Sequence, residues 1–174
     1  MKHIDIIYAR HNRGGKPPRI SPSVITYYDL TLLLSGNLHY TVDGCDILLE
    51  AGDAILIPAG SLRARAEGAQ GADYISFNFT TEGEIPLPLW IKRAVRSEIT
   101  LLVAAYDKME KHTYTANKST LAYLCGCILS VLSDISATAE YNPLTKKIIA
   151  YIQEDISRKI TLEDIGRLTF FSPI

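Results

Sequence analysis

Two arginines and three polar side chains occupy alternating positions in two short segments of the sequence. They are Arg63, Arg65, Tyr74, Ser76 and Asn78. Alternate residues of a β-strand share one face, so the members within each segment point the same way. Facing a protein interior, two guanidinium groups with hydroxyl and amide groups would bind a polyol or an anionic metabolite. The alternative is that the arginines face solvent and that Ile75, Phe77 and Phe79 fill the interior instead.

The other residues with catalytic potential form no arrangement that indicates an enzyme. Four carboxylates fall at turns, where such side chains bond the local backbone: Asp43, Asp46, Glu50 and Asp53. The histidines are scattered, and the sequence has neither a Gly-x-Ser-x-Gly string nor a phosphate-binding glycine loop. Cys125 and Cys127 have no second cysteine pair, so a zinc site is not expected. We therefore expect a protein that is not an enzyme and has no cofactor.

Composition favours an ordinary folded chain over one held to nucleic acid by bulk charge. The 174 residues carry 18 Lys and Arg against 19 Asp and Glu, and 47% of them are hydrophobic. Such a chain can bury a sizeable core, and its net charge of -1 excludes histone-like binding. Asp5 and Arg10 interrupt the start before a signal peptide develops, and the most apolar run, 121–132, is short. We expect a cytoplasmic protein with no membrane partner.

The first part of the chain, residues 1–85, is expected to form an antiparallel barrel that positions the polar set. Short runs rich in aliphatic, aromatic and β-branched residues are separated by frequent turn residues. Asp43 and Gly44 form a hairpin turn signal between two of these runs. Small barrels can hold one ligand inside, with walls formed by one alternating face of each strand.

After Pro86 and Pro88 the hydrophobic period changes from two to that of a helix, which predicts a helical pair within residues 86–140. The second helix carries an apolar stripe that is our candidate for dimerisation. Its residues are Leu121, Leu124, Ile128 and Leu132. The same stripe would serve equally well to cover the barrel, and the sequence leaves both interpretations open.

The last segment, residues 141–174, has the signals of consecutive helices. Asn142 followed by proline begins one helix. Thr161 and Asp164 have the spacing of a capping box that begins the next. Ser172 followed by proline marks a further helix start at the end of the sequence. We therefore expect the chain to continue in a longer protein.

Two stretches resemble known families. Residues 52–60, Gly-Asp-Ala-Ile-Leu-Ile-Pro-Ala-Gly, are similar to the second half of a cupin signature. Residues 142–174 resemble the start of the DNA-binding region of AraC/XylS-type transcription regulators. The order of barrel, helical pair and helix-turn-helix is also that family's order. The resemblance implies a cupin-like antiparallel β-barrel (a double-stranded β-helix), then a helical pair and the first helices of a helix-turn-helix domain.

The same resemblance implies a function. The barrel would bind a small-molecule effector, a sugar or an anionic metabolite, through the polar set of Arg63, Arg65, Tyr74, Ser76 and Asn78. The full-length parent would act as a homodimer and bind DNA through a recognition helix that begins at Ser172. In this sequence that helix is incomplete.

One departure from the cupin pattern concerns metal. Metal-binding cupins place a histidine where Arg63 stands, and the earlier strand offers only His39. Arginine cannot coordinate a cation, because its guanidinium has no free lone pair. We therefore expect no metal, in agreement with sensor cupins that bind effectors without one.

Two other functions explain parts of the chain. A metal-free cupin enzyme, such as an isomerase, explains the barrel but leaves residues 142–174 without a purpose. A pure interaction module explains the helices but not the barrel turns. A transcription regulator explains all three segments, 1–85, 86–140 and 141–174, and is the principal hypothesis.

Overall fold

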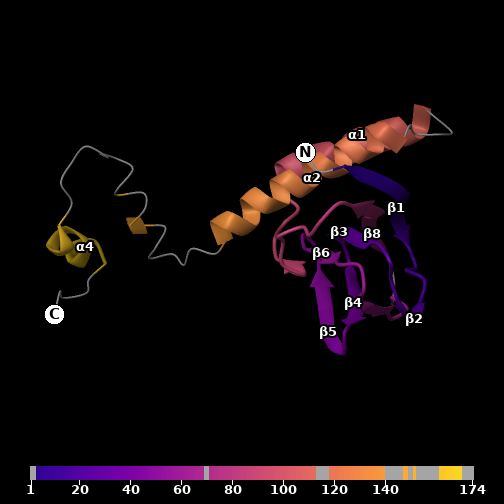
Figure 1. The fold of residues 1–174 in the computed structure, drawn as a ribbon, viewed down its shortest axis with the longest axis horizontal. Coiled ribbons are helices and arrows are strands. Elements are labelled where there is room, and N and C mark those ends of the chain that lie inside the picture. Colours follow the sequence, from indigo (N-terminus) through magenta and orange to yellow (C-terminus); the bar gives the residue numbers. More distant parts are fainter. Residues whose placement is uncertain are drawn as a thin grey trace. The chain divides into compact units, whose positions relative to one another are not determined.

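The chain forms strands first and helices afterwards (Figure 1). The computed structural model describes residues 3–68, 71–112, 118–139, 147–148, 151 and 161–169. The strands are β1 (Ile4–Gly15), β2 (Ile20–Val24), β3 (Tyr28–Ser35), β4 (Asn37–Val42), β5 (Cys45–Glu50), β6 (Ala54–Ile57), β7 (Leu62–Arg65), β8 (Ala72–Thr81) and β9 (Trp90–Ile91). The helices are α1 (Ser97–His112), α2 (Lys118–Ala139) and α4 (Leu162–Thr169).

The strands form two antiparallel sheets with the strand order of a jelly roll. One sheet runs β1-β8-β3-β6 and is extended by β9, and the other runs β2-β7-β4-β5. Sheets that exchange strands in this way form the double-sheet barrel found in cupins. The expected fold class is therefore confirmed: a cupin-like antiparallel barrel followed by helices. The short strand β9 lies just beyond the barrel boundary that the sequence suggested.

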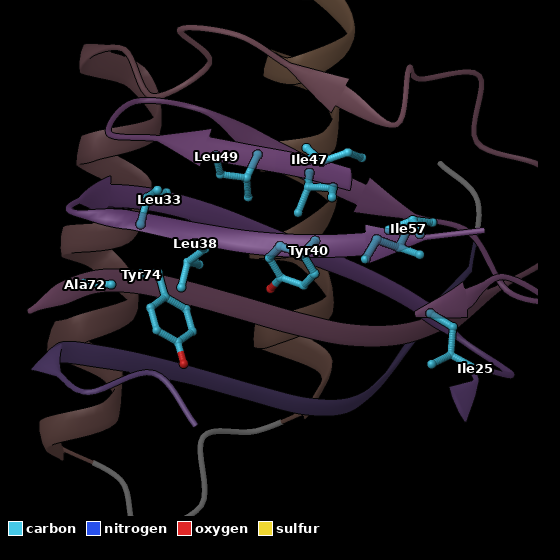
Figure 2. Packing of buried hydrophobic residues seen from close by; sticks show 11 residues of the cluster. Ile25, Leu33, Leu38, Tyr40, Ile47, Leu49, Ile57, Ala72 and Tyr74 are labelled. Atoms are coloured by element: carbon cyan, nitrogen blue, oxygen red, sulfur yellow. The ribbon is translucent and has the colours of Figure 1, made fainter. Parts of the chain in front are cut away.

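The two sheets enclose a core to which both contribute (Figure 2). Leu33 of β3 and Tyr74 of β8 belong to the same buried cluster as Leu38 and Tyr40 of β4. Their inward positions follow from the two-residue period of each strand. The interior of the barrel is thus part apolar, and its two tyrosines bring hydroxyl groups into it.

The opposite face of the first sheet is also buried. Leu30 and Phe77 are cross-strand neighbours on β3 and β8, and both are fully buried. Phe77 makes an edge-to-face contact with Tyr106 of α1, with 5.8 Å between ring centroids. On α1, Ile99 and Val103 are buried with Tyr106 and repeat at the spacing of a helical face. Phe77 therefore packs against α1 and does not fill the barrel, which leaves the polar face of β8 pointing inward.

Helix α2 combines a buried apolar stripe with an exposed side. Its stretch Lys118–Ala137 is long and apolar enough to cross a membrane, a test that core helices also pass. The sequence analysis did not predict a helix of this hydropathy, because the stretch contains no long uninterrupted apolar run. Polar residues such as Ser130 are spread through it. Leu121 and Ile128 are among its buried residues, and Tyr123 is among its exposed ones.

Two of the turn carboxylates, Asp43 and Asp53, bind groups that are distant in the sequence, which the expectation of local backbone bonds did not include. Asp43 accepts a hydrogen bond from the Leu62 backbone N–H at 2.7 Å. Asp53 is buried and accepts from the Trp90 indole N–H at 2.9 Å and the Arg93 backbone N–H at 3.0 Å. Asp53 therefore ties the segment that leads into α1 to the start of β6.

The chain divides into two compact units, Met1–Asp134 and Ile135–Ile174. In the second unit, α4 begins with the predicted capping box. The Asp164 N–H donates to Thr161 Oγ1 at 3.2 Å, and the Thr161 N–H donates to Asp164 Oδ2 at 3.0 Å. The helix starts expected at Asn142 and Ser172 lie outside the described residues.

Candidate functional site

A cavity of about 200 Å³ lies between the two sheets, and the whole predicted polar set lines it. Its members are Arg63, Arg65, Tyr74, Ser76 and Asn78. Strand β8 presents its three residues through alternation, and β7 in the facing sheet presents the two arginines. Asp29 and Tyr40 also line the cavity. Residues far apart in the sequence thus converge on one site.

Strand β1 supplies a further part of the wall. Tyr8, Arg10 and Asn12 line the cavity. Their antiparallel partners in β8 are, in the same order, Asn78, Ser76 and Tyr74. Residues paired directly across two strands lie on the same face of a sheet. The register between β1 and β8 therefore places six polar side chains side by side.

The wall contains a buried ion pair. Arg63 Nη1 donates to Asp29 Oδ2, and the two residues are only 7% and 3% exposed. Thr31 Oγ1 donates to Asp29 Oδ1 at 3.4 Å and lies 2.8 Å from Ser76 Oγ. The charge of Asp29 is therefore balanced by Arg63, and its second oxygen also has a partner.

Arg65 is buried without a carboxylate partner. It is 5% exposed, and none of the ion pairs among the described residues includes it. Its Nη1 donates to the Tyr40 hydroxyl at 3.3 Å, and its Nη2 donates to the Pro18 carbonyl at 3.2 Å. Its guanidinium carbon lies 5.7 Å from the Tyr40 ring centroid and 5.0 Å from that of Tyr74. These neutral partners orient the guanidinium but leave its charge uncompensated.

Some donor capacity in this wall is unused. The Nε atoms of Arg63 and Arg65 are buried and have no hydrogen-bond partner. Leaving a buried donor unsatisfied costs about 1–3 kcal/mol, and more for a charged group. The arginines are thus incompletely satisfied by the protein alone.

The cavity is electropositive and offers neutral donors. Three arginines and one aspartate are among its lining residues. Burial, together with the negative charge of Asp29, raises the pKa of Tyr40 to about 12, so this hydroxyl keeps its proton at neutral pH. Burial opposes the charge of Arg65, but Tyr40 and Tyr74 outweigh it and raise its pKa. The wall therefore suits an anion or hydroxyl groups.

The same side chains do not fit a metal ion. Arg63 cannot act as a metal ligand, because its guanidinium has no free lone pair and faces Asp29. His39 points away from the cavity and lies 3.8 Å from Asp46, with half of its side chain exposed. In the part of the chain that the structure describes, no three His, Cys, Asp or Glu side chains are grouped to hold a metal.

The candidate dimerisation stripe is buried within the single chain. Leu121 and Leu124 are 8% exposed, and Ile128 and Leu132 are completely covered. A second copy could reach them only if α2 moved, so these four side chains belong to the covering layer. Tyr123 on the same helix is 67% exposed and remains accessible. Dimerisation itself stays a prediction.

Sequence reasoning did not include Asp29 and Tyr40 in the site, although a signal was present. Asp29 lies in the largely apolar strand β3, where Thr31 continues the inward-facing alternation, and Tyr40 lies between the buried residues Leu38 and Val42 of β4. Polar groups that repeat with a period of two inside an apolar run indicate a polar interior surface.

Comparisons with known proteins find partial structural likeness. No family model and no curated protein matches the chain. Apo ToxT from Vibrio cholerae aligns over 99% of this chain and 70% of its own, with 9% identity and a TM-score of 0.44. A cupin protein from Bacteroides fragilis aligns over 44% of this chain and 64% of its own, with 24% identity and a TM-score of 0.32.

A third structure is an ethanolamine utilization protein Q from Salmonella typhimurium. It aligns over 35% of this chain, with 23% identity and a TM-score of 0.31. The match spans about half of that protein's length, 49%. All three TM-scores lie below 0.5, so the function is argued from the residues of the cavity.

Proposed function

We propose that this chain is the effector-binding and dimerisation portion of a transcription regulator, in which a small molecule in the barrel controls DNA binding. The observation that carries the proposal is a polar cavity with a buried arginine, Arg65, that has no carboxylate partner among the described residues. Burying an unpaired charge is destabilising. A role in ligand binding accounts for its presence.

The composition of the cavity supports binding over catalysis by a metal-free isomerase. Among the described residues that line it, the one carboxylate is Asp29, which is paired with Arg63. Tyr40 has a pKa of about 12, and no histidine is among the lining residues. General acid–base catalysis works best with a group that titrates near the operating pH. Tyr40 lacks that property, and the carboxylate of Asp29 is already engaged by Arg63.

In this proposal, the longer parent protein binds DNA. The recognition helix would begin at Ser172, and segments 142–157 and 161–170, expected from the sequence to be helical, would act as scaffold. Two copies join to span two half-sites, as helix-turn-helix proteins usually require. The near-neutral net charge of -1 fits DNA contacts confined to one local face. The protein acts in the cytoplasm, without a membrane partner.

Selection from random DNA duplexes tests the regulator hypothesis. The longer parent is expected to enrich duplexes with two related half-sites, whereas residues 1–174 alone are expected to enrich none. A folded parent that enriches no sequence, both alone and in the presence of a small-molecule metabolite extract, would refute the proposal. Specific binding by residues 1–174 alone would refute the assignment of DNA recognition to the helix beginning at Ser172.

A further inference from the structure

We propose that the effector is a small hydroxylated carboxylic acid with one negative charge, whose carboxylate lies against Arg65. The proposal rests on the proposed function, because it names the ligand class of the same cavity. Arg65 determines the sign of the charge, Asp29 the number of charges, and the other lining residues the polar groups that accompany the charge.

The sign of the charge follows from Arg65. This guanidinium is 5% exposed, and its partners are a tyrosine hydroxyl, a backbone carbonyl and two aromatic rings. A neutral sugar in the cavity would remove the remaining water around Arg65 without supplying a counter-charge. A carboxylate would supply that charge and accept hydrogen bonds from the guanidinium, whose planar geometry it matches.

The number of charges follows from Asp29. Its carboxylate already pairs with Arg63 in the buried wall, so only one buried guanidinium lacks a counter-charge among the described lining residues. Arg10 also lines the cavity, but it is exposed, and water screens its charge. A second carboxylate on the ligand would meet Asp29 without a free buried cation. The cavity therefore favours a monoanion over a dianion.

The rest of the lining favours hydroxyl groups on the ligand. Ser76, Asn78 and Asn12 supply hydroxyl and amide groups beside the arginines. The volume of about 200 Å³ equals that of roughly seven water molecules in the liquid. A four-carbon hydroxy acid has the size and the polar groups to fill such a space.

Three ligands with the same four-carbon skeleton test both the sign and the number of charges. Erythronate is the monoanion, erythritol the neutral polyol and tartrate the dianion. Calorimetric titration of residues 1–174 is expected to give the tightest binding for erythronate, by at least about tenfold, because a hydrogen bond to a charged group contributes about 1.5–3 kcal/mol.

Two variants locate the binding. Arg65→Gln keeps a polar side chain but removes the charge, and it is expected to weaken erythronate binding at least about tenfold and erythritol binding by a much smaller factor. Arg96→Gln removes an exposed charge that does not line the cavity, and it is expected to change neither. Circular dichroism checks that both variants are folded. A shift of the Arg65 Nε–H resonance on adding erythronate to the unmodified chain gives a readout that needs no variant.

Each contrary result overturns a stated part. The claim that the effector is an anion is overturned if erythritol binds as tightly as erythronate. It is also overturned if folded Arg65→Gln binds erythronate as tightly as the unmodified chain does. If tartrate binds most tightly, the claim that the effector carries one negative charge is wrong. If none of the three binds, the claim that the effector is a small hydroxy acid is wrong. The DNA selection does not depend on which effector binds the cavity, so the regulator hypothesis can survive any of these results and is refuted separately.

Discussion

Replacing Asp29 by asparagine would measure how strongly the cavity wall depends on its ion pair. The substitution keeps the shape of the side chain but removes the charge that faces Arg63. Both partners are nearly covered, at 3% and 7% exposure. The guanidinium would then remain buried without a counter-charge.

The expected loss of stability is large. Removing one partner of a buried ion pair costs about 3–5 kcal/mol, because the remaining charge is left desolvated. The hydrogen bond from Thr31, at 3.4 Å, adds little, since the asparagine oxygen can still accept it. With a slope of about 1–3 kcal/mol per molar urea, the unfolding midpoint should fall by roughly 1–5 M.

Urea denaturation followed by circular dichroism gives this quantity, and two further variants control it. Asp46→Asn removes an exposed carboxylate that accepts from Thr41 at 2.8 Å, and it should change stability by no more than about 0.5 kcal/mol. The double variant Asp29→Asn/Arg63→Met removes both charges and should recover most of the loss. If Asp29→Asn proves as mild as Asp46→Asn, or if the double variant is no more stable than Asp29→Asn, the ion pair lacks the role assigned to it.

Three other substitutions test the layers around the cavity. Leu124→Glu places a charge in the buried stripe and should unfold the chain, with a loss of folding stability above about 4 kcal/mol. If sedimentation and circular dichroism instead show a folded monomer, the result favours dimerisation through the stripe. Gly36→Ala should lower the melting temperature, because the φ angle of Gly36 is +80° and an added Cβ would lie 2.9 Å from the Cα of Ala72. We expect a strain of about 1–2 kcal/mol or more. An unchanged melting temperature would contradict this. Burial opposes the change, but hydrogen bonds from His11 and Arg13 lower the pKa of Asp107 in the folded protein. The charged carboxylate of Asp107 therefore stabilises the fold above its unfolded-state pKa of about 4. This stabilisation is lost as the pH falls through the lower pKa of the folded state. The difference in urea midpoint between the unmodified chain and Asp107→Asn should therefore shrink between about pH 7 and about pH 3, and a constant difference would contradict this assignment.

The parts of the site that the sequence predicted are those with a strong local pattern. On β8, Ser76 and Asn78 alternate with Phe77 and Phe79, and this period of two is visible without a structure. What the pattern did not decide was which face points inward, because both faces of this strand are buried. The contact between Phe77 and Tyr106 of α1 settles it, and that contact joins residues of two different layers.

The parts that the sequence did not predict depend on long-range pairing. Asp29 and Arg63 are 34 positions apart, and nothing local to either residue indicates the other. Strand β1 was missed for a different reason. A register shift between Ile6 and Tyr8 interrupts the two-residue alternation of β1. Ile6 pairs with Phe79 on the outer face, whereas Tyr8 pairs with Asn78 on the inner face, so the sequence of β1 shows no continuous alternation.

Strand β1 joins the cavity to the helical layer through its two faces. Arg10 and Asn12 line the cavity, whereas His11 and Arg13 lie on the opposite face and bind Asp107 of α1. The atoms concerned are close: His11 Nδ1 and Arg13 Nη2 each lie 2.6 Å from Asp107 Oδ1. Because residues on the two faces of a strand share one backbone, any displacement of β1 at the cavity is also a displacement of the side chains that hold α1. We therefore expect a ligand that contacts Arg10 or Asn12 to disturb this attachment more than one that contacts only the arginines of β7.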